Sequence, residues 1–484
     1  MIKTAFFLAI SLGLSCCSVG PNYKAPNTVP PKQWSTSLNT PAKPNQALAE
    51  EWWTLFNDPI LTRLITDAIA ENLDLKQALL RVKDARTLRW ITITAGLPSL
   101  TAKGTETQRF NNFPTGSQTS SGSSVGAGNQ VMNIFQMGFD AQWEIDIFGG
   151  ERRAIEAANA NIDSEIENSR QILVTLLAEV ARHYIQLRNY QQLTLITQQN
   201  LASQIETVQL TKIRQQAGFV SLLEVAQAEA QANNTAAFLP NYATTINQSI
   251  HSLSILLNKE PNALMALLLK SSQIALYINP SINNLPSELL QRRPDIRLAE
   301  RQLAKATANI GVATADLYPR FNLAAFIGLQ NSKITDFTPM GKSWSSASSI
   351  SLPLFNWGKI NANIKSKKIQ QAVISIDYEK TVLSAFKEVE DSLNAYQNEQ
   401  QRNHALIAAV NSSQLALELA NERYHNGLTM FLDVLQTQEA LYQAQRNLAD
   451  SQAQMAVDLV ALYKALGGGW QNQSSVNKTN LLKS

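Results

Sequence analysis

A chain of 484 residues is too long for one small domain, and it is poor in charge. Charged residues make up 16%, below the roughly 25% of average soluble domains, and the formal net charge is +3. This balance gives no electrostatic basis for binding nucleic acid. Both cysteines, Cys16 and Cys17, lie near the N-terminus, and the four histidines are dispersed. We therefore expect no catalytic residue, no metal site and no nucleic-acid partner.

The N-terminus has the pattern of an export signal. Lys3 precedes the apolar run 5–14, which is too short to span a bilayer. Residues 14–17 (Leu-Ser-Cys-Cys) resemble a lipobox, and a leucine occupies the −3 position if Cys17 is the lipidated residue. The alternative is an ordinary signal with incidental cysteines. We predict a signal peptide over 1–16 and a covalent lipid on Cys17, with no other cofactor. No Asp follows Cys17, which favours sorting to the outer membrane.

Proline and glycine are distributed very unevenly, and the gaps between them predict long helices. The range 151–239 has no proline and the single glycine Gly218, and the range 359–466 has no proline and the single glycine Gly427. Each range is expected to form a long helix that ends at its glycine and a second helix beyond it. The longer limbs would each reach ~100 Å at 1.5 Å per residue.

The two halves of the chain match each other. Their equivalent segments are Gly218–Val225 with Gly427–Val434, Glu179 with Glu388, and Leu97-Pro98 with Tyr318-Pro319. The chain therefore reads as a tandem duplication with one plan: helix, strand pair, long helix, glycine break, helix. The shorter helices are expected over about 60–96 and 219–257, with a kink at Pro240. An enlarged loop is expected over 111–130, which is rich in Gly, Ser and Thr. The resulting division is a signal peptide (1–16), a lipidated extended segment (17–58), a first repeat (59–270), an equatorial linker (271–285), a second repeat (286–469) and a C-terminal tail (470–484).

Period-two alternation predicts two strands in each repeat. In 137–147, Phe139, Ala141, Trp143 and Ile145 alternate with polar and acidic residues. The ranges 321–329 and 345–354 are weaker examples. Three tryptophans near these strands are expected either in interfacial aromatic belts or in the core, and they are Trp143, Trp344 and Trp357.

Four strands cannot form a transmembrane pore alone. In hydrocarbon every backbone N–H and C=O needs a partner, so a sheet with free edges must be closed by neighbouring copies. Two copies would give eight strands, and three would give twelve with more room for a lumen. The alternative is a soluble sandwich on a helical stalk.

Several segments together resemble one known family. The most specific is Leu-Pro-Ser-Glu-Leu-Leu-Gln-Arg-Arg-Pro-Asp-Ile-Arg at 285–297. The others are Cys17–Tyr23, Trp52-Trp53 with Phe56–Pro59, Asn72–Leu75 with Ala78 and Arg81-Val82, Ala299-Glu300, and Leu317–Pro319. Over nearly its whole mature length the chain is similar to the outer-membrane efflux ducts, in the lipoprotein branch that serves resistance-nodulation-division pumps.

The resemblance implies a mainly α fold with a β-barrel part. Three copies would form an α-helical tunnel of long antiparallel helices and a twelve-stranded barrel, with four strands from each copy. The implied partners are two further copies (a homotrimer), a periplasmic adaptor, an inner-membrane pump of that class and outer-membrane lipid. The duct would be passive rather than an enzyme, carrying drugs or other small molecules, lipid-anchored in the outer membrane and extending into the periplasm.

The resemblance also places the two glycine breaks at the periplasmic tip, where the tunnel closes. Gly218 and Gly427 supply the unusual backbone angles that a helix reversal requires. With Phe219 and Leu428 they are the expected tip turns and adaptor contacts.

A gate is predicted just beyond these turns. Glu224 and Asp433 occupy equivalent repeat positions, and their copies would form rings of negative charge in a narrow neck. The alternative is that both are solvated carboxylates at helix starts, where the helix dipole favours them. Tyr424 matches a family tyrosine that helps to hold the neck shut. Thr429 and Gln436 stand where some relatives have Arg and Asp, which argues against a salt-bridge latch.

Other functions remain open from the sequence. The chain could be the exit duct of a type I protein-secretion system, although the lipobox and the 285–297 segment favour the pump branch. A non-transport stalk or adhesin is disfavoured by the acidic face of 137–147. A cell-envelope hydrolase is more distant still.

Overall fold

The computed structural model describes residues 18–31, 33–35, 51–111, 130–270, 286–336 and 341–471. The predicted signal peptide, Cys17, the linker 271–285 and nearly all of the tail lie outside the described residues. So does the interior of the loop expected over 111–130. The chain divides into two compact units. The sheet unit is the described part of Met1–Pro26, Lys83–Asp163 and Glu300–Ile376, and the helical unit is the described part of Asn27–Val82, Ser164–Ala299 and Asp377–Ser484.

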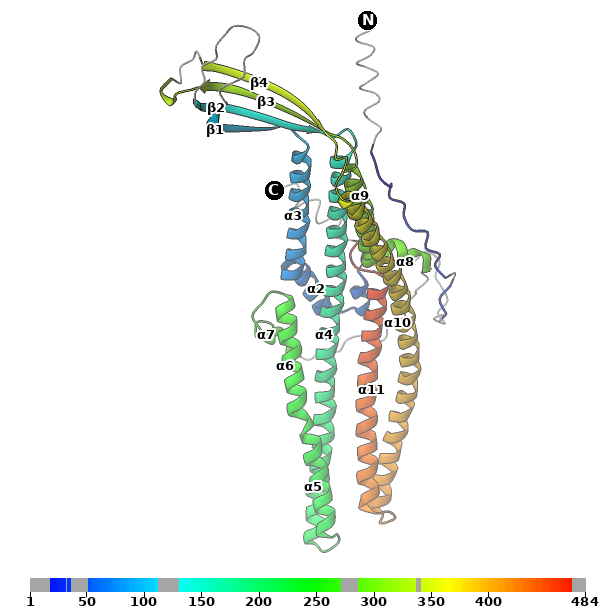
Figure 1. Ribbon diagram of the computed structural model, residues 1–484. Coiled ribbons are helices and arrows are strands. Elements are labelled where there is room, and N and C mark those ends of the chain that lie inside the picture. The colour runs from blue at the N-terminus through cyan, green and yellow to red at the C-terminus, as the bar shows by residue number, and fades with distance from the viewer. Residues whose placement is uncertain are drawn as a thin grey trace, which may run out of the picture. The chain divides into compact units, whose positions relative to one another are not determined.

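The sheet unit contains an antiparallel sheet in the order β1-β2-β3-β4 (Figure 1). Its strands are β1 (Ser99–Asn111), β2 (Gln130–Ile145), β3 (Arg320–Asn331) and β4 (Lys342–Ser351). The prediction of four strands, two from each repeat, is confirmed. Within the described residues β1 and β4 each pair with only one strand, so the sheet has two open edges.

The two faces of the sheet differ in chemistry. On one face Asp140 lies opposite Thr101 of β1 and Phe326 of β3, and its carboxylate is 4.0 Å from the Lys103 ammonium. The other face carries an exposed apolar set, which includes Phe139, Trp143, Leu323, Ile327, Trp344 and Ile350. Alternate side chains of a strand point to opposite faces, so the predicted amphipathic pattern accounts for both.

The long helices follow the predicted plan. They are α4 (Gly150–Gln216) and α10 (Lys359–His425), followed after the glycine breaks by α5 (Leu222–Ala236) and α11 (Phe431–Ala465). Pro240 lies three residues into α6 (Phe238–Leu256), and the interruption that separates α5 from α6 falls at Ala237. Proline cannot donate its backbone bond and clashes with the preceding turn, so the break precedes it.

The expected single helix over 60–96 is wrong. Two helices, α2 (Pro59–Glu71) and α3 (Leu73–Ala95), are separated at Asn72. The Asn72 side chain accepts a bond from the Leu75 backbone N–H at 2.9 Å and donates to the Leu256 carbonyl at 2.9 Å. An asparagine that caps one helix and bonds a remote backbone group favours the break over a continuous helix.

The core of the helical unit is a large apolar cluster. It includes Trp52, Phe56, Leu177, Tyr184 and Leu459. The remaining elements of the described residues are the 3-10 helices η1 (Trp52–Phe56) and η2 (Ile334–Asp336), and the helices α7 (Met265–Leu268), α8 (Pro286–Arg292) and α9 (Pro294–Ala315). None of the helices in the described residues carries an apolar stretch long enough to cross a membrane.

Candidate functional site

The two glycine breaks form the same turn. At the end of α4 the Phe219 N–H donates to the Arg214 carbonyl at 2.9 Å, and the Gly218 N–H donates to the Gln215 carbonyl at 3.0 Å. The end of α10 repeats this pair, with Leu428 donating to Arg423 at 2.8 Å and Gly427 to Tyr424 at 3.0 Å. The φ angles of Gly218 and Gly427 are +78° and +72°, a left-handed conformation that glycine adopts without strain.

The turns present apolar side chains to the surface. Phe219 is 81% exposed and Leu428 is 67% exposed. Leu222, Leu223 and Met430 beside them are also exposed. A cluster of exposed apolar side chains at one end of a unit is typical of a surface that contacts another protein.

Asp433 lies in the first turn of α11, and its side chain caps the start of this helix. Its carboxylate accepts a bond from the Thr429 hydroxyl and one from the Met430 backbone N–H at 3.3 Å. The contact satisfies an N–H that has no partner inside the helix. Two roles were considered for Asp433. The single chain shows its carboxylate at the helix start, and its place in a ring of negative charge stays a prediction. Thr429 is therefore the hydrogen-bond partner of Asp433.

Glu224 and Gln436 are less constrained. Glu224 lies in the first turn of α5 and is half-buried, at the repeat position that corresponds to Asp433. Gln436 is exposed, one turn beyond Asp433 on α11.

Tyr424 joins the two long helices at the tip. Its ring lies under the Arg214 guanidinium, 4.7 Å from the ring centre, and packs 5.5 Å from the Phe431 ring. The Tyr424 hydroxyl is buried and has no hydrogen-bond partner among the described residues. A buried unpaired hydroxyl is costly, so the packing of the Tyr424 ring against Arg214 and Phe431 must offset this cost at the tip.

The helix pairs at the tip are held together by polar contacts and a small core. Lys212 of α4 and Glu229 of α5 form an ion pair of 2.7 Å, and Gln231 of α5 donates to Glu439 of α11. The small apolar core of these helices contains Val208, Ala228, Ala232, Phe431 and Leu435. The structure thus brings Tyr424 and Asp433 of the predicted gate onto one pair of helices, α10 and α11, and Glu224 onto α5.

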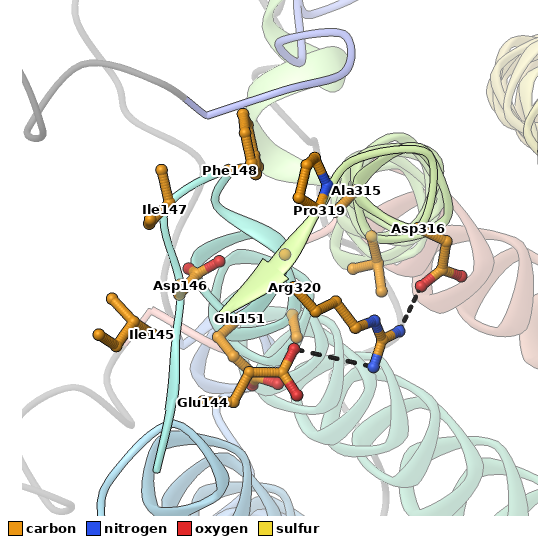
Figure 2. Close-up of a pocket in the computed structure, with 13 residues that line it drawn as sticks. Glu144, Ile145, Asp146, Ile147, Phe148, Glu151, Ala315, Asp316, Pro319 and Arg320 are labelled. Carbon is orange, nitrogen blue, oxygen red and sulfur yellow. Dashed lines mark hydrogen bonds and ion pairs between the residues drawn. The ribbon is translucent and has the colours of Figure 1, made fainter. Parts of the chain in front are cut away.

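A second polar centre lies where the sheet meets α4 and α9. Figure 2 shows Arg320 between Asp316 and Glu144, with distances of 2.6 Å and 3.7 Å. These residues, with Asp146 and Glu151, line a cavity of about 110 Å³. Burial raises the pKa of Glu151 above its ordinary value of 4.5, and the nearby Asp146 and Glu144 carboxylates raise it further.

The segment after the predicted lipid site is fixed to the sheet unit by Arg153. This buried guanidinium donates to the Val19 and Gly20 carbonyls at 3.1 and 3.3 Å and to the Asn22 side chain at 2.7 Å. Gly311 leaves room for the Arg153 stem, because a Cβ there would lie 2.7 Å from Arg153 Cγ. The sequence reasoning missed Arg153, although a glycine inside the helix α9 was a signal of close approach.

The described residues contain no group of three or more His, Cys, Asp or Glu side chains arranged to hold a metal ion. Within the 285–297 segment, the buried Arg293 side chain forms two ion pairs. Arg293 contacts Asp295 at 2.6 Å and Glu388 at 2.7 Å, and it donates to the Ala465 carbonyl at 2.8 Å.

Comparison with known proteins decides the family. A model of the family described as Outer membrane efflux protein matches residues 64–259 and 285–468. The chain belongs to this family. As an outer membrane efflux protein it resembles the solvent efflux pump outer membrane protein SrpC of Pseudomonas putida, with 33% identity over 472 residues, 95% of this chain and 97% of SrpC. It is also 32% identical to nodulation protein T of Rhizobium leguminosarum bv. viciae, over 95% of this chain and 92% of that protein.

The fold of this efflux protein matches a solved channel. The structure of the outer-membrane channel OprN superimposes with a TM-score of 0.86 and 31% identity, covering 94% of this chain and 100% of that chain. The family expected from the sequence is therefore confirmed, as is the fold of long helices with a small antiparallel sheet. Family membership also assigns this efflux protein to the outer membrane.

Proposed function

We propose that this efflux protein is the exit duct of a tripartite pump, a passive homotrimeric channel that carries small molecules from the periplasm to the exterior. The observation that carries the proposal is the match to the OprN channel over nearly the whole length of both chains. The efflux relatives, such as SrpC, support transport of small molecules.

The sheet supports assembly into a trimer. Its apolar face is exposed in one chain, and both edge strands lack a second partner within the described residues. Insertion in lipid requires that these edges be paired. Three copies would close twelve strands around a lumen lined by the face that carries Lys103 and Asp140.

The tip of the helical unit is the proposed gate and docking site. The exposed Phe219 and Leu428 suit an adaptor protein in the periplasm, which would link the duct to an inner-membrane pump of the resistance-nodulation-division class. The proposed gate residues are Tyr424, whose ring packs against Arg214 and Phe431 at the tip, and the carboxylates of Glu224 and Asp433.

The N-terminal segment supports a lipid anchor on Cys17. Ser18 follows Cys17 in the sequence. Ser18 also lies against Gly149, where a Cβ would approach the Ser18 Cα to 2.8 Å. The Val19 N–H donates to the Phe148 carbonyl at 3.1 Å, so the anchor would be tethered beside the base of the sheet.

The proposal is tested by deleting the gene and measuring tolerance to drugs, solvents and metal ions. Loss of tolerance that returns with the intact gene is the expected result. Unchanged tolerance together with loss of a secreted protein would overturn the proposal in favour of type I secretion. Unchanged tolerance with a loss of adhesion would favour a stalk.

A further inference from the structure

At one corner of the sheet unit, the end of β2 packs against the turn that leads into the neighbouring strand β3. Where β2 ends and α4 begins, the Phe148 ring stacks on Tyr318 with 4.7 Å between ring centres. Tyr318 belongs to the turn between α9 and β3. Gly149 follows Phe148 with a φ of +81° and allows the chain to enter α4. Figure 2 shows Phe148 and Pro319 on the same side of the cavity at this corner.

The second repeat contains the equivalent segment of sequence, with a different backbone at Trp357, whose φ is +54°. Gly358 precedes α10 with a φ of +76°, and its offset from Gly149 equals that between Gly218 and Gly427. Trp357 is therefore the sequence counterpart of Phe148. On the other side of the contact, Leu97-Pro98 between α3 and β1 is the counterpart of Tyr318-Pro319.

Among the described residues of one chain, no side chain of the Leu97 turn covers this second corner. Trp357 is 90% exposed and Phe355 is 75% exposed. Leu97, the counterpart of Tyr318, is 52% exposed. The reason is topological, because β2 and β3 are neighbours in the sheet whereas β4 and β1 form its opposite edges. Trp357 can meet a Leu97 turn only if that turn belongs to another copy.

The first corner carries charged residues, whereas the equivalent positions of the second corner are uncharged. In the first corner Glu144 and Arg320 are charged and lie 3.7 Å apart. Their counterparts are Pro353 and Ser99, and the counterpart of Asp146 is Phe355. The second corner thus has fewer charges and one more aromatic ring than the first. This composition suits a contact between two separate chains, which is stabilised by apolar burial.

The faces of the strands agree with this arrangement. The same offset carries Phe139 of β2 to Ser348, which lies on the face of β4 that bears Trp344 and Ile350. The offset between Leu97 and Tyr318 likewise relates Phe321 of β3 to Leu100, which lies on the apolar face of β1. If the alignment of the repeats were shifted by one residue, it would relate side chains on opposite faces of the sheet.

We infer that the exposed corner at Leu354, Phe355 and Trp357 is the surface on which a second copy of this chain docks, through the turn at Leu97. Each copy repeats between chains the contact that Phe148 and Tyr318 make inside one chain. The inference rests on the proposed function, because it assumes that copies join through the edges of their sheets.

The test is chemical cross-linking of the full-length protein in membranes. A double variant with Leu97→Cys and Trp357→Cys is treated with a short bismaleimide and analysed by denaturing electrophoresis. Linked dimers and trimers are expected. The matched control, Phe148→Cys with Tyr318→Cys, is expected to link within one chain and to migrate as a single copy. The single variants reveal any link through Cys16 or Cys17.

The outcomes separate this inference from the proposed function. A protein that is single-copy by native mass measurement would overturn both. A trimer in which the Leu97 and Trp357 variant stays unlinked, while the control pair links, would overturn the inference alone. As a second measurement, Trp357→Ala is expected to lower the temperature at which the oligomer dissociates. The control Ile334→Ala removes an exposed side chain of η2, beyond the far end of β3, and is expected to leave that temperature unchanged. An unchanged temperature for Trp357→Ala would also overturn the inference.

Discussion

The Tyr184 hydroxyl donates a hydrogen bond of 2.7 Å to the Asp58 carboxylate in the core of the helical unit. The other oxygen of that carboxylate accepts the Ile60 and Leu61 backbone N–H groups at 2.8 and 3.1 Å, which starts α2. One buried carboxylate therefore joins α4 to the N-terminus of α2. Burial, together with the bond to Asp58, raises the pKa of Tyr184, so its hydroxyl remains a donor at neutral pH.

Tyr184→Phe is expected to reduce the free energy of unfolding by about 1.5–3 kcal/mol, because it removes a hydrogen bond to a buried charged group. Denaturant unfolding of the detergent-solubilised protein measures this loss. Tyr463→Phe is the matched control, since Tyr463 stacks on Trp52 in the same core and no hydrogen bond of its hydroxyl is found in the described residues. Equal losses in both variants would contradict a specific role for the Asp58 bond.

Gly427→Ala is expected to destabilise the tip by roughly 1–2 kcal/mol. The cause is backbone strain alone, because φ is +72° and a Cβ would meet no atom within 4 Å. Hydrogen exchange of the amides near the turn between α10 and α11 measures the local opening. Gly96→Ala serves as the control, because its backbone is not left-handed and the nearest contacts of a Cβ are an ordinary 3.6 Å. Undisturbed exchange in Gly427→Ala would show that the turn tolerates a side chain.

Glu151→Gln is expected to stabilise the sheet unit at neutral pH and to have little effect in acid. The folded-state pKa of Glu151 is raised, so the folded chain holds this proton more tightly than the unfolded chain. The resulting stabilisation is complete below the ordinary value of 4.5 and is lost as the pH rises through the raised pKa. Thermal unfolding across a pH series measures the difference. A gain that grows toward acid pH would reverse the predicted sign.

Asp433→Asn is expected to weaken the block of the channel by multivalent cations in planar bilayers, because it removes one negative charge from each copy at the neck. Thr429→Val is the control that keeps the charge and removes the hydroxyl bonded to Asp433. Block should fall in the first variant and persist in the second. If Asp433→Asn is blocked as strongly as the native channel, the carboxylate does not line the constriction and acts only at the helix start.

Much of the fold could be predicted because its signals are local. Long ranges without proline, with one glycine each, predict α4 and α10 nearly to the residue. Alternation in 137–147 predicts the second half of β2, which begins at Gln130, because strand periodicity is read directly from neighbouring residues. The helix break at Asn72 was not predicted, because the Leu256 carbonyl that favours it lies far away in the sequence.

The sequence by itself determined the repeat, the helix reversals at Gly218 and Gly427 and the amphipathic strands, because each depends on residue spacing along the chain. Only the tertiary structure decided which residues meet across the chain. It showed that Asp433 is bonded to Thr429, that Arg153 binds the segment at Val19, and that Phe148 is covered while Trp357 is exposed. Such pairings arise from strand order and helix packing, which bring together segments that no local pattern relates.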